Sequence, residues 1–501
     1  MKGKMLDRRD TSMDLIRIVA VFLVMSVHFL YHTSKTVENN AHMGFYNLTV
    51  NGYGPIEGIV KFIESGNFSD LHGPLIFLMV LMKVLFSACV PLFMILTGYL
   101  MSTKTLSRKY YYGIRKTLVV FVLASVVCMF FKSVYLNPQA KAAFEQFDLN
   151  TMFNAIEATE SYEPKDYILS IFGFSGANYS WYVEMYIGLF LIAPFLNLAY
   201  NKLDSQRKKL VLVGTVVFLA ILPSLVNAFR FDNANWWLNP MSDNKGYQKL
   251  IPAFWMGSMY PVAYYFTGAY IREYGIKLKT RAMLPLFGIM LFLCTAFSFY
   301  RSYGGNFQAG SWIYWYGVEP YIISSLLFVL LSRVRANNWH PTVRKVMWKV
   351  SDVTFGMYLL SFIFDMLIYN SWLNEIRRTG FEKLPFYFVA VPLCFLFSLA
   401  ASLAVTTFAK GLIILYEKIK KWFKEQLAEP RKVNWQDVLF AALLIGALLC
   451  AFWKVRYGFG GNDEAFYLTI PHRLAKGDAL FRDEWNLSQM CSILQLPFVW
   501  V

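Results

Sequence analysis

Long apolar runs separated by short polar segments dominate this sequence of 501 residues. Each run is long enough to cross a bilayer, which takes about 20 residues of helix. Helix is the expected conformation because lipid cannot satisfy exposed backbone groups. The clearest runs are 13–31, 75–101, 117–136, 181–200, 209–228, 251–271, 282–300, 313–332, 352–370, 384–409 and 437–453, with another from about 490. The pattern predicts an all-α, polytopic transmembrane helix bundle of about ten helices, followed by one and a half more.

The predicted helices fall into two unequal modules. The first ten lie in residues 1–425, which we expect to form one membrane domain. Residues 416–433 are basic and amphipathic, so we expect them at headgroup level, and we place a linker at 426–434. Residues 435–501 hold one apolar run, a polar loop and the start of another run. We interpret this last part as the truncated start of a second membrane module.

Composition agrees with a membrane protein, and the distribution of charge predicts its orientation. Apolar residues make up 56% of the chain and charged residues 16%, yet the formal net charge is +16. A basic patch could indicate nucleic acid, but here Lys and Arg concentrate in alternate loops instead. That is the positive-inside pattern. It predicts a multi-pass protein of the bacterial inner (plasma) membrane with a cytoplasmic N-terminus, in contact with membrane lipids and with no nucleic acid partner.

The six cysteines all lie in or near apolar runs, and no CxxC spacing occurs. They are therefore interpreted as small core residues, not as metal ligands or a disulfide framework. We expect no metal and no bound cofactor.

The first apolar run carries three ionisable residues: Asp14, Arg17 and His28. Such groups are costly inside a membrane and are functional candidates. Arg17 and His28 are eleven residues apart, close to three helical turns, so they share a face about 16 Å apart along the axis. Asp14 lies one turn before Arg17 and can pair with it.

This spacing separates two kinds of chemistry. An arginine near the cytoplasmic surface suits an anionic ligand such as a nucleotide phosphate. A deeper histidine suits general-base catalysis on a hydroxyl, because its pKa is ordinarily near neutral. A structural interpretation stays open, in which Arg17 snorkels to the interface and His28 is a hydrogen-bonded core residue.

Five segments resemble the acyltransferase-3 family of integral membrane acyltransferases, over about residues 10–415. The first is the Asp14, Arg17 and His28 pattern itself. The others are CVPLFMILTGYLM at 89–101 with Lys83 upstream, RKYYYGIRK at 108–116, WYVEMYIGLFLIAPFLN at 181–197, and SDVTFGMYLLS at 351–361. The 181–197 stretch is similar to the subgroup that O-acetylates surface polysaccharides. The last segment departs from the family, which usually has His where Ser361 stands, so the role of that position is in doubt.

The resemblance implies transfer of an acyl group, with acetyl expected, from acyl-CoA (acetyl-CoA) as co-substrate to a hydroxyl. The acceptor is expected to be a cell-envelope glycan or a lipid-linked saccharide. Carried over to this chain, His28 is the expected base, with Arg17 and Asp14 also catalytic. The expected donor-binding residues are Arg115 and Lys83, and the expected acceptor-binding residues are Trp181, Tyr182, Glu184 and Tyr99.

Other interpretations remain open. An intramembrane Arg and His on one face also suit a transporter of an acyl group or polysaccharide. Residues after 457 resemble the first loop of protein-mannosyltransferase-type glycosyltransferases, with Asp463 and Glu464 as the acidic pair, so a glycosyltransferase using a lipid-linked sugar is a further alternative. Glu319 and Asp365 are expected to be polar contacts between helices, and Gly98 a close-packing glycine.

Overall fold

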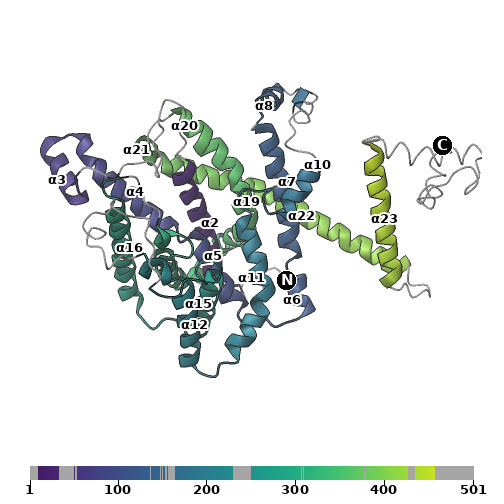
Figure 1. Cartoon of the computed structure of the whole chain (residues 1–501), viewed down its shortest axis with the longest axis horizontal. Coiled ribbons are helices and arrows are strands. Elements are labelled where there is room, and N and C mark those ends of the chain that lie inside the picture. The colour runs from purple at the N-terminus through teal and green to yellow at the C-terminus, as the bar shows by residue number, and fades with distance from the viewer. Residues whose placement is uncertain are drawn as a thin grey trace, which may run out of the picture. The chain divides into compact units, whose positions relative to one another are not determined.

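The computed structural model describes residues 9–32, 50, 53–135, 137–146, 148, 151–152, 155, 164–228, 250–305, 307, 310–376, 380–426 and 435–456. The described parts are helical (Figure 1), and within them the only extended pairing is an isolated bridge between Val50 and Tyr303. The chain divides into two compact units, Met1–Ile413 and Ile414–Val501. The expected all-α polytopic bundle is confirmed.

Except for α18, which lies between two of them, the longer helices follow the predicted apolar runs. They are α2 (Thr11–His32), α4 (His72–Phe86), α5 (Cys89–Met101), α7 (Arg115–Tyr135), α11 (Trp181–Asn201), α12 (Gln206–Ala220), α15 (Tyr260–Tyr274), α16 (Thr280–Ser302), α17 (Val318–Ser332), α18 (Pro341–Ser351), α19 (Thr354–Phe364), α22 (Tyr387–Gln426) and α23 (Trp435–Arg456).

Shorter helices connect them: α3 (Pro55–Ser65), α6 (Arg108–Tyr112), α8 (Pro138–Glu145), α10 (Pro164–Phe172), α13 (Pro223–Val226), α20 (Leu373–Ile376) and α21 (Gly380–Lys383). Single 3₁₀ turns stand at Phe68–Leu71, Ser311–Ile313, Ala336–Asn338 and Leu384–Phe386. Among the described residues, eight helical segments are long and apolar enough to cross a membrane, or nine if α18 and the bent helix after it count as one span. The protein is therefore a multi-pass membrane protein by length and composition.

Two predicted spans differ in detail. The run 251–271 becomes α15, which begins at Tyr260 and has 15 residues. Residues 254–258 form turns instead, and Pro261 stands in the first turn of the helix, where proline is tolerated. The run 75–101 is interrupted between Phe86 and Cys89, which gives two helices, α4 and α5.

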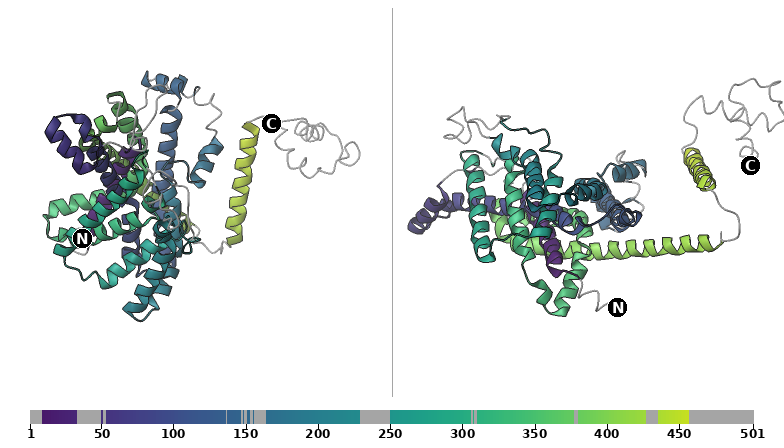
Figure 2. Two further views of the ribbon diagram at one scale, coloured as in Figure 1. Left: turned by 60° about the vertical axis from the view of Figure 1, so that its left-hand side comes forward. Right: turned by 90° about the horizontal axis from the view of Figure 1, so that it is seen from below.

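Helix α2 lies inside the first unit. It packs against α4, α5, α17, α18 and α19, and Ile16, Ala20 and Met25 are fully buried. The three views in Figures 1 and 2 show neighbouring helices on several sides of α2. A helix that is apolar on most faces gains stability by being surrounded, so the ionisable groups on α2 are held inside protein.

Helices α5 and α15 approach each other closely because small residues lie at their contact. A Cβ atom on Gly98 would stand 1.9 Å from the carbonyl oxygen of Tyr265, and one on Gly268 would stand 2.0 Å from that of Ile95. Small residues let membrane helices approach to backbone contact. The expectation that Gly98 is a close-packing glycine is confirmed.

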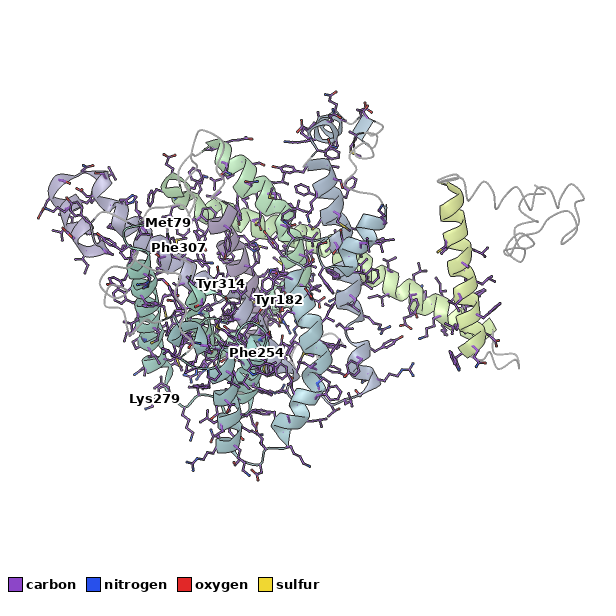
Figure 3. The ribbon with its side chains drawn as sticks, in the orientation of Figure 1. Met79, Tyr182, Phe254, Lys279, Phe307 and Tyr314 are labelled. Atoms are coloured by element: carbon purple, nitrogen blue, oxygen red, sulfur yellow. The ribbon has the colours of Figure 1, made fainter. Side chains whose placement is uncertain are left out.

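Aromatic side chains fill much of the space between helices. Tyr182 of α11 is buried and lies among packed side chains in Figure 3, whereas the exposed Lys279 lies at the edge. Helix α19 continues into a π-helical segment, Asp365–Trp372. Such π-helical turns are rare and frequently occur at functional sites.

In the second unit, the basic residues from 416 onward continue α22 as helix as far as Gln426. Helix α23 follows at Trp435–Arg456, near the predicted run 437–453. Asp463 and Glu464 lie outside the described residues, so the glycosyltransferase interpretation stays a prediction.

Candidate functional site

His28, in the last turns of α2, pairs with a carboxylate from the π-helical segment. Its Nδ1 lies 2.8 Å from Oδ2 of Asp365, and its side chain is 12% exposed. Tyr179 stacks on the imidazole, with ring centroids 4.0 Å apart, and its hydroxyl donates to the same Asp365 oxygen at 2.7 Å. A histidine, a carboxylate and a tyrosine therefore form one hydrogen-bonded group.

Asp365 is fully buried, and its second oxygen accepts from the Cys394 thiol at 3.2 Å. A buried carboxylate that bonds one imidazole nitrogen fixes the orientation of the ring. The interhelical contact expected of Asp365 is present, but its partnership with His28 was missed. The signal that could have found it is an ionisable residue within an apolar run.

A cavity of about 320 Å³ opens beside His28. Its walls are mainly aromatic and aliphatic, and Trp181 stacks on Trp315 with ring centroids 6.1 Å apart. The lining residues are Val24, Val27, His28, Tyr31, Cys89, Val90, Tyr179, Trp181, Trp315 and Tyr358. We call this space the His28 cavity.

Lys83 belongs to the surroundings of the His28 cavity. Its Nζ donates to the hydroxyl of Tyr31 at 2.9 Å and lies 5.9 Å from the ring centre of Trp315. The side chain is buried. The structure therefore places Lys83 away from Arg17, with which it was expected to bind the donor.

A second group of charges surrounds Asp14, near the start of α2. Asp14 is 2% exposed, and its carboxylate accepts from Nε of Arg9 at 2.8 Å and from Nη2 of Arg9 at 2.5 Å. Arg17 lies 3.3 Å from the same carboxylate, which confirms the expected pairing. The hydroxyl of Ser351 also donates to Asp14, at 2.6 Å.

A cavity of about 540 Å³ opens beside these charges. It is lined by Arg9, Asp10, Met13, Asp14, Arg17, Leu100, Ser351, Asp352, Thr354 and Phe355. We call it the Arg17 cavity. It differs from the His28 cavity in that half of its lining residues are charged.

Three helices contribute walls to both cavities. On α2, the lining positions follow the spacing of one helical face, from Met13, Asp14 and Arg17 to Val24, Val27, His28 and Tyr31. Helix α5 contributes Cys89 to the His28 cavity and Leu100 to the Arg17 cavity. Helix α19 contributes Tyr358 to the His28 cavity and Phe355 to the Arg17 cavity. The predicted shared face of Arg17 and His28 is thus present.

The other expected site residues are scattered. Trp181 lines the His28 cavity, and Tyr182 lies behind it, 5.4 Å from the ring of Tyr358. Glu184 is exposed and lines neither cavity. Tyr99 lies beside Arg272, which donates to its carbonyl at 2.8 Å.

Arg115 contacts Tyr112, three residues before it, and does not line the Arg17 cavity. Its guanidinium stacks 3.8 Å from the ring centre of Tyr112, and its Nε donates to the Tyr112 carbonyl at 3.1 Å. The next residue, Lys116, does reach a wall of that cavity through Asp352, at 2.8 Å. Donor binding by Arg115 stays a prediction.

Ser361 is fully buried on α19, and its hydroxyl donates to the Tyr358 carbonyl at 3.0 Å. It stands one helical turn before Asp365. In the described part of the chain, no group of three or more His, Cys, Asp or Glu residues could hold a metal ion.

A comparison with protein-family models adds the class of protein. The family model described as an acyltransferase domain, of the acyltransferase-3 type, matches residues 10–406. The chain therefore belongs to the acyltransferase-3 family and is a membrane acyltransferase. No curated protein and no solved structure matches it.

Proposed function

We propose that this membrane acyltransferase transfers an acetyl group from acetyl-CoA to a hydroxyl of a cell-envelope glycan or lipid-linked saccharide. The observation that carries this proposal is the His28–Asp365 pair, in which His28 lines a cavity of about 320 Å³. A histidine held by a carboxylate is the arrangement that general-base catalysis on a hydroxyl needs.

In the proposed step, Nε2 of His28 takes the proton of the acceptor hydroxyl. The hydroxyl oxygen attacks the thioester carbonyl, the carbon–sulfur bond breaks, and the departing thiolate receives the proton from the imidazolium. Asp365 stabilises the imidazolium while the proton resides there, because Nδ1 donates to its carboxylate. Tyr179, hydrogen-bonded to the same carboxylate, fixes its position.

The Arg17 cavity suits the donor. Its guanidiniums can hold phosphate groups, for which arginine has the appropriate geometry. In the proposed orientation, the protein lies in a bacterial inner membrane with its N-terminus in the cytoplasm. This cavity then faces the compartment that contains acyl-CoA. About 16 Å of helix separates Arg17 from His28, a distance that the extended arm of the donor bridges between the two cavities.

The His28 cavity suits a sugar acceptor. The stacked pair Trp181 and Trp315 offers flat aromatic surface at its wall, and such surface suits the apolar face of a sugar ring. Lys83 and Tyr31 add polar groups beside the same wall. We therefore propose that Lys83 acts at the acceptor end.

The test uses the purified full chain in nanodiscs, with radiolabelled acetyl-CoA and an envelope glycan extract. Label should enter the glycan with the wild type and be lost with His28→Ala, while the variant stays folded and inserted. The matched control is His340→Ala, because His340 is exposed and lines neither cavity. Retained labelling with His28→Ala would exclude His28 as the base.

The same two cavities also support a second candidate, a transporter that moves an acyl group or polysaccharide along the α2 face. The two functions differ in their covalent product. A transferase leaves label on the isolated glycan, whereas a transporter moves label or polymer across a proteoliposome membrane without acylating it.

A further inference from the structure

We infer that Arg9, together with Arg17 and the N-terminus of α19, forms the site that binds the phosphate groups of the donor. This inference rests on the proposed function and identifies which residues recognise the anionic part of that substrate. Arg9 was not among the residues expected from the sequence to act in binding or catalysis, but it lines the Arg17 cavity.

Arg9 is held in place on two sides. Its guanidinium makes two hydrogen bonds to Asp14, at 2.8 and 2.5 Å, and lies 5.2 Å from the ring centre of Trp348. Its side chain nevertheless remains 30% exposed. A guanidinium that is oriented by a carboxylate and an aromatic ring retains donors for a planar anion such as phosphate.

The charges of this group do not cancel. Asp14 carries one negative charge, and both Arg9 and Arg17 pair with it. One positive charge is therefore in excess within these three residues. Because Asp14 is 2% exposed and also accepts from Ser351, it works as a fixed anchor for two arginines.

The start of α19 adds a second positive element. Thr354 and Phe355, its first residues, line the same cavity, and no side chain caps this helix end. The first backbone N–H groups of a helix lack intrahelical acceptors, and the helix dipole favours an anion near them. The guanidiniums and the helix end thus face one space.

The remaining carboxylates of the cavity have partners of their own. Asp352 is bonded to Lys116 at 2.8 Å and to Lys410 at 2.9 Å. Asp10 accepts from the backbone N–H of Ser12 at 3.0 Å. The two lysines more than offset the charge of Asp352. Together with them, the charged residues that line the cavity carry one positive charge in excess, and the two arginines remain as the groups that can receive a phosphate.

A phosphate ester or pyrophosphate could reach this site from two sources: the nucleotide part of acyl-CoA or a phospholipid headgroup. Adenosine 3′,5′-bisphosphate is the soluble probe for the first source. Its binding is measured by calorimetry on the full chain in nanodiscs of zwitterionic phospholipid, and again in nanodiscs that contain anionic phospholipid.

Arg9→Gln should weaken binding of the bisphosphate about 10- to 100-fold, because a hydrogen bond to a charged group is lost. The control is Arg281→Gln, which removes the same charge from an exposed position outside both cavities and should bind like the wild type. Arg9→Lys keeps the charge but loses the planar fork, so it should restore only part of the affinity. A partial recovery of this kind also shows that a chain without the Arg9 guanidinium can fold and bind.

Equal binding by Arg9→Gln and the wild type would overturn the inference. So would a wild type that ignores the bisphosphate but retains anionic lipid through Arg9, since the site would then take a headgroup. The transfer assay separates this inference from the proposed function. Bisphosphate binding that depends on Arg9, without any glycan labelling, supports the phosphate site and contradicts the transferase. Glycan labelling that is unchanged in Arg9→Gln supports the transferase and contradicts the phosphate site.

Discussion

The two ends of α2 are built from different kinds of side chains. At the Arg17 end, charged groups line a cavity of about 540 Å³, and both arginines are 30% exposed. At the His28 end, aromatic walls surround a smaller cavity, and the ion-pairing carboxylate is fully buried. The first arrangement suits recognition of a charged, water-soluble group, whereas the second suits chemistry that benefits from exclusion of water.

This difference has an electrostatic consequence. Exposed charges are screened by salt, whereas buried pairs are screened much less. Interactions at the Arg17 end should therefore weaken as ionic strength rises, while the His28–Asp365 pair should keep its strength. Recognition and chemistry can thus be separated by substitutions at one end only.

The largest effect is expected from Asp365→Asn, which keeps the shape of the side chain but removes the charge that orients His28. The rate constant kcat should fall about 100- to 10,000-fold, the range attributed to general acid–base catalysis, with the KM for acetyl-CoA unchanged. Steady-state kinetics in nanodiscs measure both quantities. An increase in the KM for acetyl-CoA without loss of kcat would show that Asp365 acts in donor binding and not in the chemistry at the His28 end.

An intermediate effect is expected from Gly98→Ala, because the new methyl group would stand 1.9 Å from the Tyr265 carbonyl. Overpacking of this kind costs about 1–3 kcal/mol, so the thermal midpoint in detergent should fall. The control is Gly188→Ala, where no atom lies within 4 Å of the added Cβ.

Gly98 lies two residues before Leu100, which lines the Arg17 cavity. A displaced α5 should therefore weaken donor binding more than it lowers kcat. The reverse pattern would show that α5 transmits strain to the His28 end instead.

A smaller effect is expected from Tyr179→Phe, which removes the hydrogen bond to Asp365 but keeps the ring that stacks on His28. A hydrogen bond to a charged group contributes about 1.5–3 kcal/mol, and part of this remains because His28 still pairs with Asp365. The kcat should fall about tenfold and the thermal midpoint should also fall, because a buried acceptor loses its donor, with the KM for acetyl-CoA unchanged. A loss as large as that of Asp365→Asn would make Tyr179 a reacting group.

Local patterns in the sequence were sufficient for the spans and for the shared face of Arg17 and His28. Both follow from helical periodicity within one segment. Gly98 was also predictable, because small residues within apolar membrane helices concentrate where two helices meet. The interruption of the run 75–101 and the short length of α15 were harder to predict, since hydropathy does not show where a buried helix begins.

Contacts between distant segments could not be predicted from local patterns in the sequence. Asp365 meets His28 across 337 positions of sequence, and the packing of α19 and the π-helical segment against α2 brings them together. The same reason applies to Arg9, which became a site residue because Asp14 and Trp348 fix it beside the cavity. Family motifs also grouped Lys83 with Arg17, whereas the structure places Lys83 beside the His28 cavity.

The separation of recognition from chemistry along α2 is tested most directly by the affinity of His28→Ala for adenosine 3′,5′-bisphosphate. Calorimetry on this variant and on the wild type in identical zwitterionic nanodiscs gives the two dissociation constants. We expect the constants to be equal although the variant no longer labels glycan, because His28 lies about 16 Å from Arg17. Binding weakened tenfold or more by His28→Ala would contradict the account.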